Sequence, residues 1–252
     1  FIGGTDLCDY ADFLVPPSNA HQFYTNLFEY IRALAWHTID LRSIPQDSPT
    51  LEWIPNLAAC SGYTCTVVEE DAAPKATLAP TWDMFISTLS KKSRHELRRK
   101  LRRIETEGSA THQTYSNPKS VQENIHDFFR LHRASSRDKS EFMTAEREAF
   151  FSDMSVEFAG NDELILSFLK IGGVRAASCL VFNYRDTHLL YNSGYDPSYS
   201  KLSVGLINKA FAVKDVILAG KRHFDFLRGT ERYKYELGGE NTSVFSLTVR
   251  RQ

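Results

Sequence analysis

The stretch HLLYNSGYDPSYSKLSVGLINKAFAVKDVILAG at positions 188–220 decides the fold of this 252-residue chain. It begins with an apolar, strand-like run over His188–Ser193, which ends at the turn residues Gly194–Pro197. Apolar residues then recur at helical spacing between 203 and 219, with Ser203 as candidate N-cap and Gly220 as C-terminal stop. A helix that starts soon after a strand carries unpaired backbone N–H groups, which suit a pyrophosphate. We therefore predict a strand, a helix and an anion site at the helix start.

The flanking sequence predicts more strands and helices. Gly172-Gly173 is a hairpin turn between two β-rich runs, and Val121–Ser135 and Ala145–Ala159 have helical periodicity. One further strand is predicted to end near Gly3-Gly4, and the other predicted strands cover 36–41, 63–69, 164–170, 174–183, 223–227 and 243–249. The remaining predicted helices cover 20–34, 48–60 and 231–237.

The two halves of the chain show related patterns. HTIDLRS at 37–43 and HFDFLRG at 223–229 each place an Asp within a predicted strand and an Arg just past its end. We interpret this as a degenerate duplication of one α+β unit; the alternative is that any two such stretches share the pattern. The predicted units are 1–115, including a basic linking helix over 82–108, and 116–252. The linking segment is either one helix or two helices broken near 90–93.

Composition and charge exclude several classes of protein. Hydrophobic residues make up 42% and charged residues 24%, and the net charge is −1, which is typical of a globular protein and not of a disordered chain. No apolar run is long enough for a membrane-spanning helix. The tract 91–103 is unusual, because it holds eight Lys and Arg residues and one acid. The four scattered cysteines indicate buried small side chains in a reducing compartment, without a zinc site.

One polar cluster follows the predicted strand at 223–227. We expect it to gather at the strand's C-terminal end, where sites in α/β units commonly lie; a local salt-bridge network is the alternative. His132 on a predicted helix is more typical of a structural histidine. The chain contains no Walker, Rossmann, G-x-S-x-G or H-E-x-x-H motif. The cluster consists of Asp225, Arg228, Glu231, Tyr233 and Lys234.

In order along nearly the whole chain, several motifs resemble the GNAT superfamily, specifically the bacterial acetyltransferases associated with cellulose biosynthesis. Those proteins are in turn similar to Fem-type aminoacyltransferases. The resemblance implies a GNAT fold and an N-acyltransferase that uses acyl-CoA, with acetyl-CoA as the expected donor, and no metal. The motifs are Trp82, Leu89–Arg94, Leu97–Arg103, Phe129–His132, Tyr191–Pro197, Ser203–Gly205, Phe224–Gly229 and Tyr233-Lys234.

The resemblance also implies roles for particular residues. A splayed strand would pair with the pantetheine arm, and the next helix start would hold the pyrophosphate. Asp225 or Glu231 would be the base, Tyr191 or Tyr233 the acid for the leaving thiolate, and Lys234 would stabilise negative charge. Residues expected to bind the donor are Asn192, Ser193, Gly194, Tyr195, Lys201, Ser203, Val204, Gly205 and Leu206.

Two alternatives remain open at this point. The superfamily loop Q/R-x-x-G-x-G/A has its nearest match in Ser200–Gly205, with Ser at the first two marked positions. A Fem-like enzyme would take aminoacyl-tRNA instead, and the tract 91–103 would contact its phosphates. A degenerate GNAT fold that only binds a ligand is the other alternative. We expect a cytoplasmic protein with a small-molecule donor and an amine acceptor.

Overall fold

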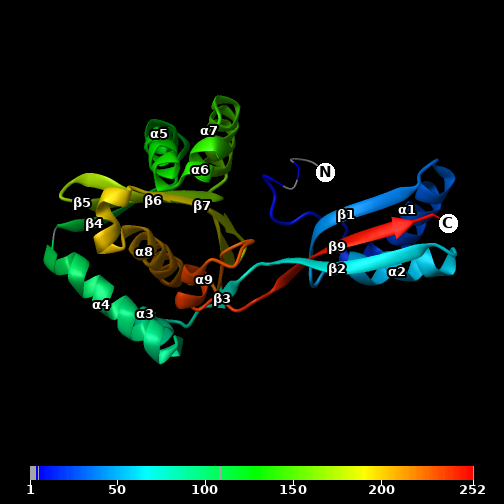
Figure 1. Ribbon diagram of the computed structural model, residues 1–252, viewed down its shortest axis with the longest axis horizontal. Coiled ribbons are helices and arrows are strands. Elements are labelled where there is room, and N and C mark those ends of the chain that lie inside the picture. Colours follow the sequence, from blue (N-terminus) through cyan, green and yellow to red (C-terminus); the bar gives the residue numbers. More distant parts are fainter. Residues whose placement is uncertain (1–3, 5, 108, 252) are drawn as a thin grey trace. The chain divides into compact units, whose positions relative to one another are not determined.

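The computed structural model describes residues 4, 6–107 and 109–251 and divides the chain into two units (Figure 1). The larger unit comprises 75–227 and 231–240, and the smaller one comprises 1–74, 228–230 and 241–252. This division differs from the predicted boundary between 115 and 116. It differs because the last strand of the chain pairs with two strands near the N-terminus, and because the basic helix packs within the larger unit.

The larger unit is built on a six-stranded sheet in the order β3-β8-β7-β6-β5-β4. β7 and β8 run parallel, and the other neighbours are antiparallel. The predicted hairpin turn at Gly172-Gly173 is confirmed, since both glycines have positive φ between β5 and β6. The strands are β3 (Lys75–Thr77), β4 (Ala110–Tyr115), β5 (Leu164–Ile171), β6 (Val174–Tyr184), β7 (Thr187–Tyr195) and β8 (His223–Asp225).

Helices cover both faces of this sheet (Figure 1). α5 (Pro118–Ser135), α6 (Arg137–Phe142) and α7 (Ala145–Gly160) lie on one face, and α8 (Val204–Leu218) lies on the other. The predicted linking segment forms two helices, α3 (Trp82–Thr88) and α4 (Lys91–Glu107), whose apolar sides pack against α8. The short helix η2 (Pro197–Leu202) precedes α8, and the short helix α9 (Arg232–Glu236) follows β8.

The smaller unit is a three-stranded antiparallel sheet in the order β1-β9-β2. Its core includes Tyr24, Phe28 and Leu247. The strand predicted to end near Gly3-Gly4 lies largely outside the described residues, and the proposed duplication stays a prediction. The elements are η1 (Pro17–Asn19), α1 (Ala20–Ala33), β1 (Thr38–Pro45), α2 (Thr50–Cys60), β2 (Thr64–Ala72) and β9 (Ser243–Arg250).

Candidate active site

β7 and β8 separate at the centre of the larger sheet. Within the described chain they pair only over Thr187–Leu189 and His223–Asp225. The register of β6 against β7 shifts so that Leu180 pairs with Asn192 and Val181 with Leu190, which leaves Tyr191 as the extra residue of a bulge. β7 continues to Tyr195, whereas β8 ends at Asp225. The second half of β7 therefore has an edge that no strand of the described chain covers.

A buried ammonium group lies just beyond the end of β8. The Lys234 side chain is 1% exposed, and its Nζ donates to the Leu227 carbonyl at 2.9 Å and lies 3.0 Å from Glu231 Oε2. Leu227 has a left-handed backbone (φ 59°), and Asp225 Oδ1 accepts its N–H at 2.8 Å. Asp225 therefore holds the turn that presents the Leu227 carbonyl to Lys234, so its structural role is in the scaffold of the cluster.

Tyr233 and a second lysine lie beside this ammonium. Lys209 of α8 is buried, donates to the Gly205 carbonyl at 3.2 Å and places its Nζ 4.5 Å from the centre of the Tyr233 ring. Burial lowers the pKa of Lys209 and raises the pKa of Tyr233 well above its ordinary value. Tyr233 is therefore a neutral phenol that can donate a hydrogen bond. The sequence analysis missed Lys209, whose only signal is a lysine next to the apolar positions of the 203–219 helix.

The open edge of β7 is occupied by polar side chains. Lys139 Nζ donates to the Ser193 carbonyl, and Asn192 Oδ1 accepts the Ser193 N–H at 2.9 Å. Ser135 Oγ accepts the Tyr195 N–H at 2.8 Å, and its one proton lies between the Leu131 carbonyl at 2.8 Å and the Tyr195 carbonyl at 3.3 Å. Both backbone polar groups of Ser193 and the N–H of Tyr195 thus have partners inside the protein.

α5 packs directly on the backbone of β7. A Cβ on Gly194 would lie 2.3 Å from the backbone nitrogen of His132, so only glycine fits at this position. His132 is buried, and its Nε2 lies 2.9 Å from Asn192 Oδ1. Because that oxygen only accepts, His132 carries its proton on Nε2. Burial, with a smaller contribution from Lys139, lowers the pKa of His132 to about 4, so the imidazole is a neutral support for β7.

This arrangement of a bulged, splayed strand followed by a helix agrees with the comparisons to known proteins. An acetyltransferase (GNAT) domain family matches residues 91–235, which is more than half of the chain. The chain belongs to the GNAT acetyltransferase domain family. No curated protein sequence matches the chain significantly.

Solved structures confirm the GNAT fold. FemX superposes with a TM-score of 0.65 at 10% identity, over 93% of this chain and 78% of FemX. The C-terminal domain of a protein assigned as a lysylphosphatidylglycerol synthetase from Agrobacterium fabrum superposes with a TM-score of 0.60 at 11% identity. The match covers 92% of this chain and 73% of that domain's chain. L-PGS from Bacillus licheniformis superposes with a TM-score of 0.59 at 11% identity, over 92% of this chain and 74% of L-PGS.

The predicted phosphate loop of this GNAT domain lies at the start of α8. Ser203 has a left-handed backbone (φ 55°), and its carbonyl accepts the N–H groups of Leu206 and Ile207. A Cβ on Gly205 would lie 3.3 Å from the Tyr195 ring, so that ring covers the first turn. Val204 is buried and Lys201 is exposed. The helix start predicted at 203–206 is confirmed, and its binding of a pyrophosphate stays a prediction.

The structure brings Glu231, Tyr233 and Lys234 together. Asp225 lies beside them in the turn at Leu227, whereas Arg228 and Tyr191 lie elsewhere. Arg228 belongs to the smaller unit, where its Nε lies 3.2 Å from Asp9 Oδ1 and its Nη1 3.3 Å from Glu70 Oε1. Tyr191 stacks on Phe151 of α7, with ring centres 5.5 Å apart.

Three further expectations from the sequence concern metal ions, membrane spans and cysteines. In the described part of the chain, no group of three or more His, Cys, Asp and Glu side chains is arranged to hold a metal ion. Among the helices of the described residues, none has the length and apolar character that a membrane span requires. The expectation that the cysteines are buried is confirmed for Cys179 and wrong for Cys60, because Cys60 is exposed at the end of α2.

Proposed function

We propose that this GNAT domain transfers an acyl group to an amine by direct attack, with Lys234 as the residue that stabilises the transition state. The buried Lys234 ammonium, fixed on the Leu227 carbonyl beyond the end of β8, is the observation that carries the proposal. As the amine nitrogen attacks the acyl carbon, the carbonyl oxygen gains negative charge. A fixed, water-excluded cation stabilises such an oxyanion far better than a solvated one does.

The neighbouring side chains can manage the protons. The amine must lose one proton as the new C–N bond forms, and the Glu231 carboxylate is the base that we assign, since its side chain is 56% exposed and therefore accessible. When the bond to the leaving group breaks, Tyr233 can supply the proton that the leaving sulfur or oxygen takes. Burial keeps the phenol of Tyr233 protonated but makes it a weaker acid than a free tyrosine, so the leaving atom has to take the proton through a direct hydrogen bond as negative charge builds on it. The proton that Glu231 takes from the amine then restores the phenol.

A kinetic comparison of two lysine variants tests the role of Lys234. Lys234→Met keeps the length of the buried side chain and removes its charge, so we expect kcat to fall by about 10²–10³ with little change in KM. Lys119→Met, at an exposed position on α5, is the matched control and should keep its turnover. Unchanged kcat in a folded Lys234→Met protein would contradict the proposal.

Acyl-CoA is the donor that membership in the GNAT family supports. In this proposal Asn192–Tyr195 accept the pantetheine arm, while Lys201 and the helix start at 203–206 hold the pyrophosphate. The arm would have to displace Lys139 and Ser135 from the edge of β7, because those side chains now satisfy its polar groups. The likeness to the cellulose-biosynthesis type of acetyltransferase stays a prediction.

An aminoacyl ester carried by tRNA is the second candidate donor, as the Fem-type resemblance implies. The occupied edge of β7 favours it, since such a donor has no pantetheine arm that needs this edge. Native mass spectrometry against acetyl-CoA and longer acyl-CoAs separates the two donors. A stoichiometric acyl-CoA adduct would support the first donor, and its absence in folded protein would favour the second.

A further inference from the structure

The smaller unit contains a cavity that the proposed acyl transfer does not use. Its volume is about 740 Å³, and it is lined by the segment at 8–14, by residues of β1 and by the start of α2. This volume is in the range of sites that take small organic molecules. The walls are mainly apolar or aromatic, and they include Tyr10, Phe13, Leu14, Leu41 and Ile44.

The segment that forms one wall is held in place by its own contacts. The backbone N–H of Ala11 donates to the Ser43 carbonyl at 2.8 Å. The Phe13 ring packs edge-on against the buried Tyr24 ring, with ring centres 6.0 Å apart. The wall is therefore preformed, and a ligand would not have to order it on binding.

A carboxylate is fixed at this wall by a chain of hydroxyl groups. The buried Thr50 hydroxyl donates to Asp12 Oδ1 at 2.5 Å and accepts from the Tyr24 hydroxyl at 2.7 Å. The Phe13 N–H donates to the same Asp12 oxygen at 2.8 Å. Asp12 Oδ2 has no hydrogen-bond partner among the described residues, and the side chain is exposed. One oxygen thus orients the carboxylate, and the other is accessible to a ligand.

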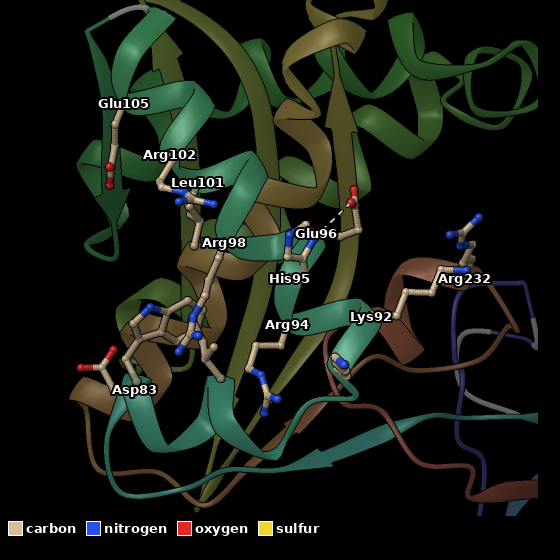
Figure 2. A pocket seen from close by; sticks show the side chains of 13 residues that line it. Asp83, Lys92, Arg94, His95, Glu96, Arg98, Leu101, Arg102, Glu105 and Arg232 are labelled. Carbon is tan, nitrogen blue, oxygen red and sulfur yellow. Dashed lines mark ion pairs between the residues drawn. The ribbon is translucent and has the colours of Figure 1, made fainter.

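The charge of the cavity is negative. Of the described residues that line it, none is a lysine, arginine or histidine, and two are acids, Asp12 and Asp40. Asp40 is paired with Arg42, whose Nε lies 2.8 Å from its Oδ2. In the described part of the chain no basic group lies within 4.0 Å of the Asp12 carboxylate. The groove drawn in Figure 2 has the opposite character, since arginines such as Arg94 and Arg98 line it.

We infer that the cavity of the smaller unit binds a small organic cation, a protonated primary amine with an apolar or aromatic body. Its ammonium group would pair with Asp12 Oδ2, and its body would cover the Phe13 and Ile44 side chains. Aromatic walls add a favourable interaction with a cation. An anion would instead meet the Asp12 carboxylate without any cation among the described lining residues to offset it.

This inference is independent of the acyl transfer that we propose for the larger unit. Every lining residue of the cavity belongs to the smaller unit, whereas Lys234 belongs to the larger one. Binding of the amine therefore needs none of the residues that we assign to the reaction.

Titration with three phenyl compounds that differ in charge tests the inference. The full chain would be titrated with 2-phenylethylamine, 2-phenylethanol and 3-phenylpropionate, and binding followed by ligand-detected NMR and calorimetry. We expect saturable binding of the amine, and binding of the neutral alcohol that is at least about tenfold weaker because it lacks the charged hydrogen bond. The anion should not bind measurably.

Two variants of the cavity and one control locate the binding. Asp12→Asn removes the charge and keeps an oxygen that can accept from Thr50, so it should weaken binding of the amine at least about tenfold. Asp47→Asn is the matched control, at an exposed position between β1 and α2 that does not line the cavity, and it should leave the affinity unchanged. Ala11→Leu fills part of the space and should weaken binding of the amine and of the alcohol alike.

Several results would overturn the inference: no binding of the amine to the folded protein, equal binding of amine and alcohol, or equal effects of Asp12→Asn and Asp47→Asn. Binding that is lost in Lys234→Met and kept in Asp12→Asn would also overturn it, because the amine would then lie at the acyl-transfer centre. The turnover of Lys234→Met tests the proposed function separately, so either proposal can fail without the other.

Discussion

Replacing Gly194 by alanine should separate α5 from the central sheet. An added Cβ would lie 2.3 Å from the His132 nitrogen, 2.5 Å from the Leu131 carbonyl carbon and 2.6 Å from the His132 Cα. All three atoms belong to the helix backbone, so no side-chain rotation can relieve the overlap. To restore ordinary contact, α5 or β7 must move by roughly 1 Å, and such shifts in a packed core are costly.

The expected cost combines two effects. Overpacking typically costs about 1–3 kcal/mol, and the shift also weakens the His132–Asn192 and Ser135–Tyr195 hydrogen bonds, each worth about 1 kcal/mol. We therefore expect a loss of about 3–5 kcal/mol in the free energy of unfolding. For a chain of this size this loss corresponds to a decrease of roughly 10 °C in Tm.

Gly205→Ala is the matched control for this change. Its Cβ would lie 3.3 Å from the edge of the Tyr195 ring, which is a side chain that can yield, and alanine favours the helical backbone by up to about 1 kcal/mol. Urea denaturation of both variants should show a large loss for Gly194→Ala and a change within about 1 kcal/mol for Gly205→Ala. Equal stabilities would refute the close packing of α5 on β7.

Three further perturbations have defined outcomes. Burial lowers the pKa of His132 and of His188 to about 4, so at each of them the unfolded chain binds more protons between pH 4 and 6.5. Each of these histidines should make the unfolding free energy fall by about 1.4 kcal/mol per pH unit as the pH decreases, and urea titrations of His188→Gln should show a slope smaller by about that amount than the wild type. Arg175→Met removes the ion pair with Asp127 and should cost about 2 kcal/mol in a thermal unfolding assay, whereas an unchanged Tm would show that the pair contributes little. Lys139→Met frees the Ser193 carbonyl and should tighten binding of acyl-CoA in calorimetry if the donor has a pantetheine arm; weaker binding would mean that Lys139 itself contacts the donor.

Local patterns in the sequence predict the elements that position the site. The apolar run at 188–193 and the periodicity at 203–219 correspond to β7 and α8, and the break near 90–93 corresponds to the gap between α3 and α4. These features depend on residues close together in the chain, where strand alternation, helical periodicity and glycine turns are informative.

Other elements are too short or too polar for such patterns. β3 has three residues, β4 reads Ala110–Tyr115 with little apolar alternation, and α6 is a six-residue polar helix. The place of β9 between β1 and β2 depends on pairing across most of the chain, which no local pattern contains.

The candidate site shows the same limit. Glu231, Tyr233 and Lys234 are neighbours in sequence, and the first turn of α9, with Glu231 at its N-cap, keeps them close together; their catalytic roles stay a prediction. Arg228 follows the same strand, but its partner Asp9 is 219 residues away, and this contact places it in the smaller unit. Lys139 lies on α6 and reaches β7 across 54 residues, so the sequence offered no signal that the edge of β7 is occupied.

Formation of an amide product is the measurement that tests the central claim most directly. Purified protein would be incubated with a panel of primary amines and with either acetyl-CoA or aminoacylated tRNA, and the products analysed by mass spectrometry. We predict a new amide with one of the two donors, formed by the wild type and reduced at least about a hundredfold in Lys234→Met. Folded wild-type protein that binds a donor and forms no amide with any amine, or amide formation that is equal in Lys234→Met, would contradict the account.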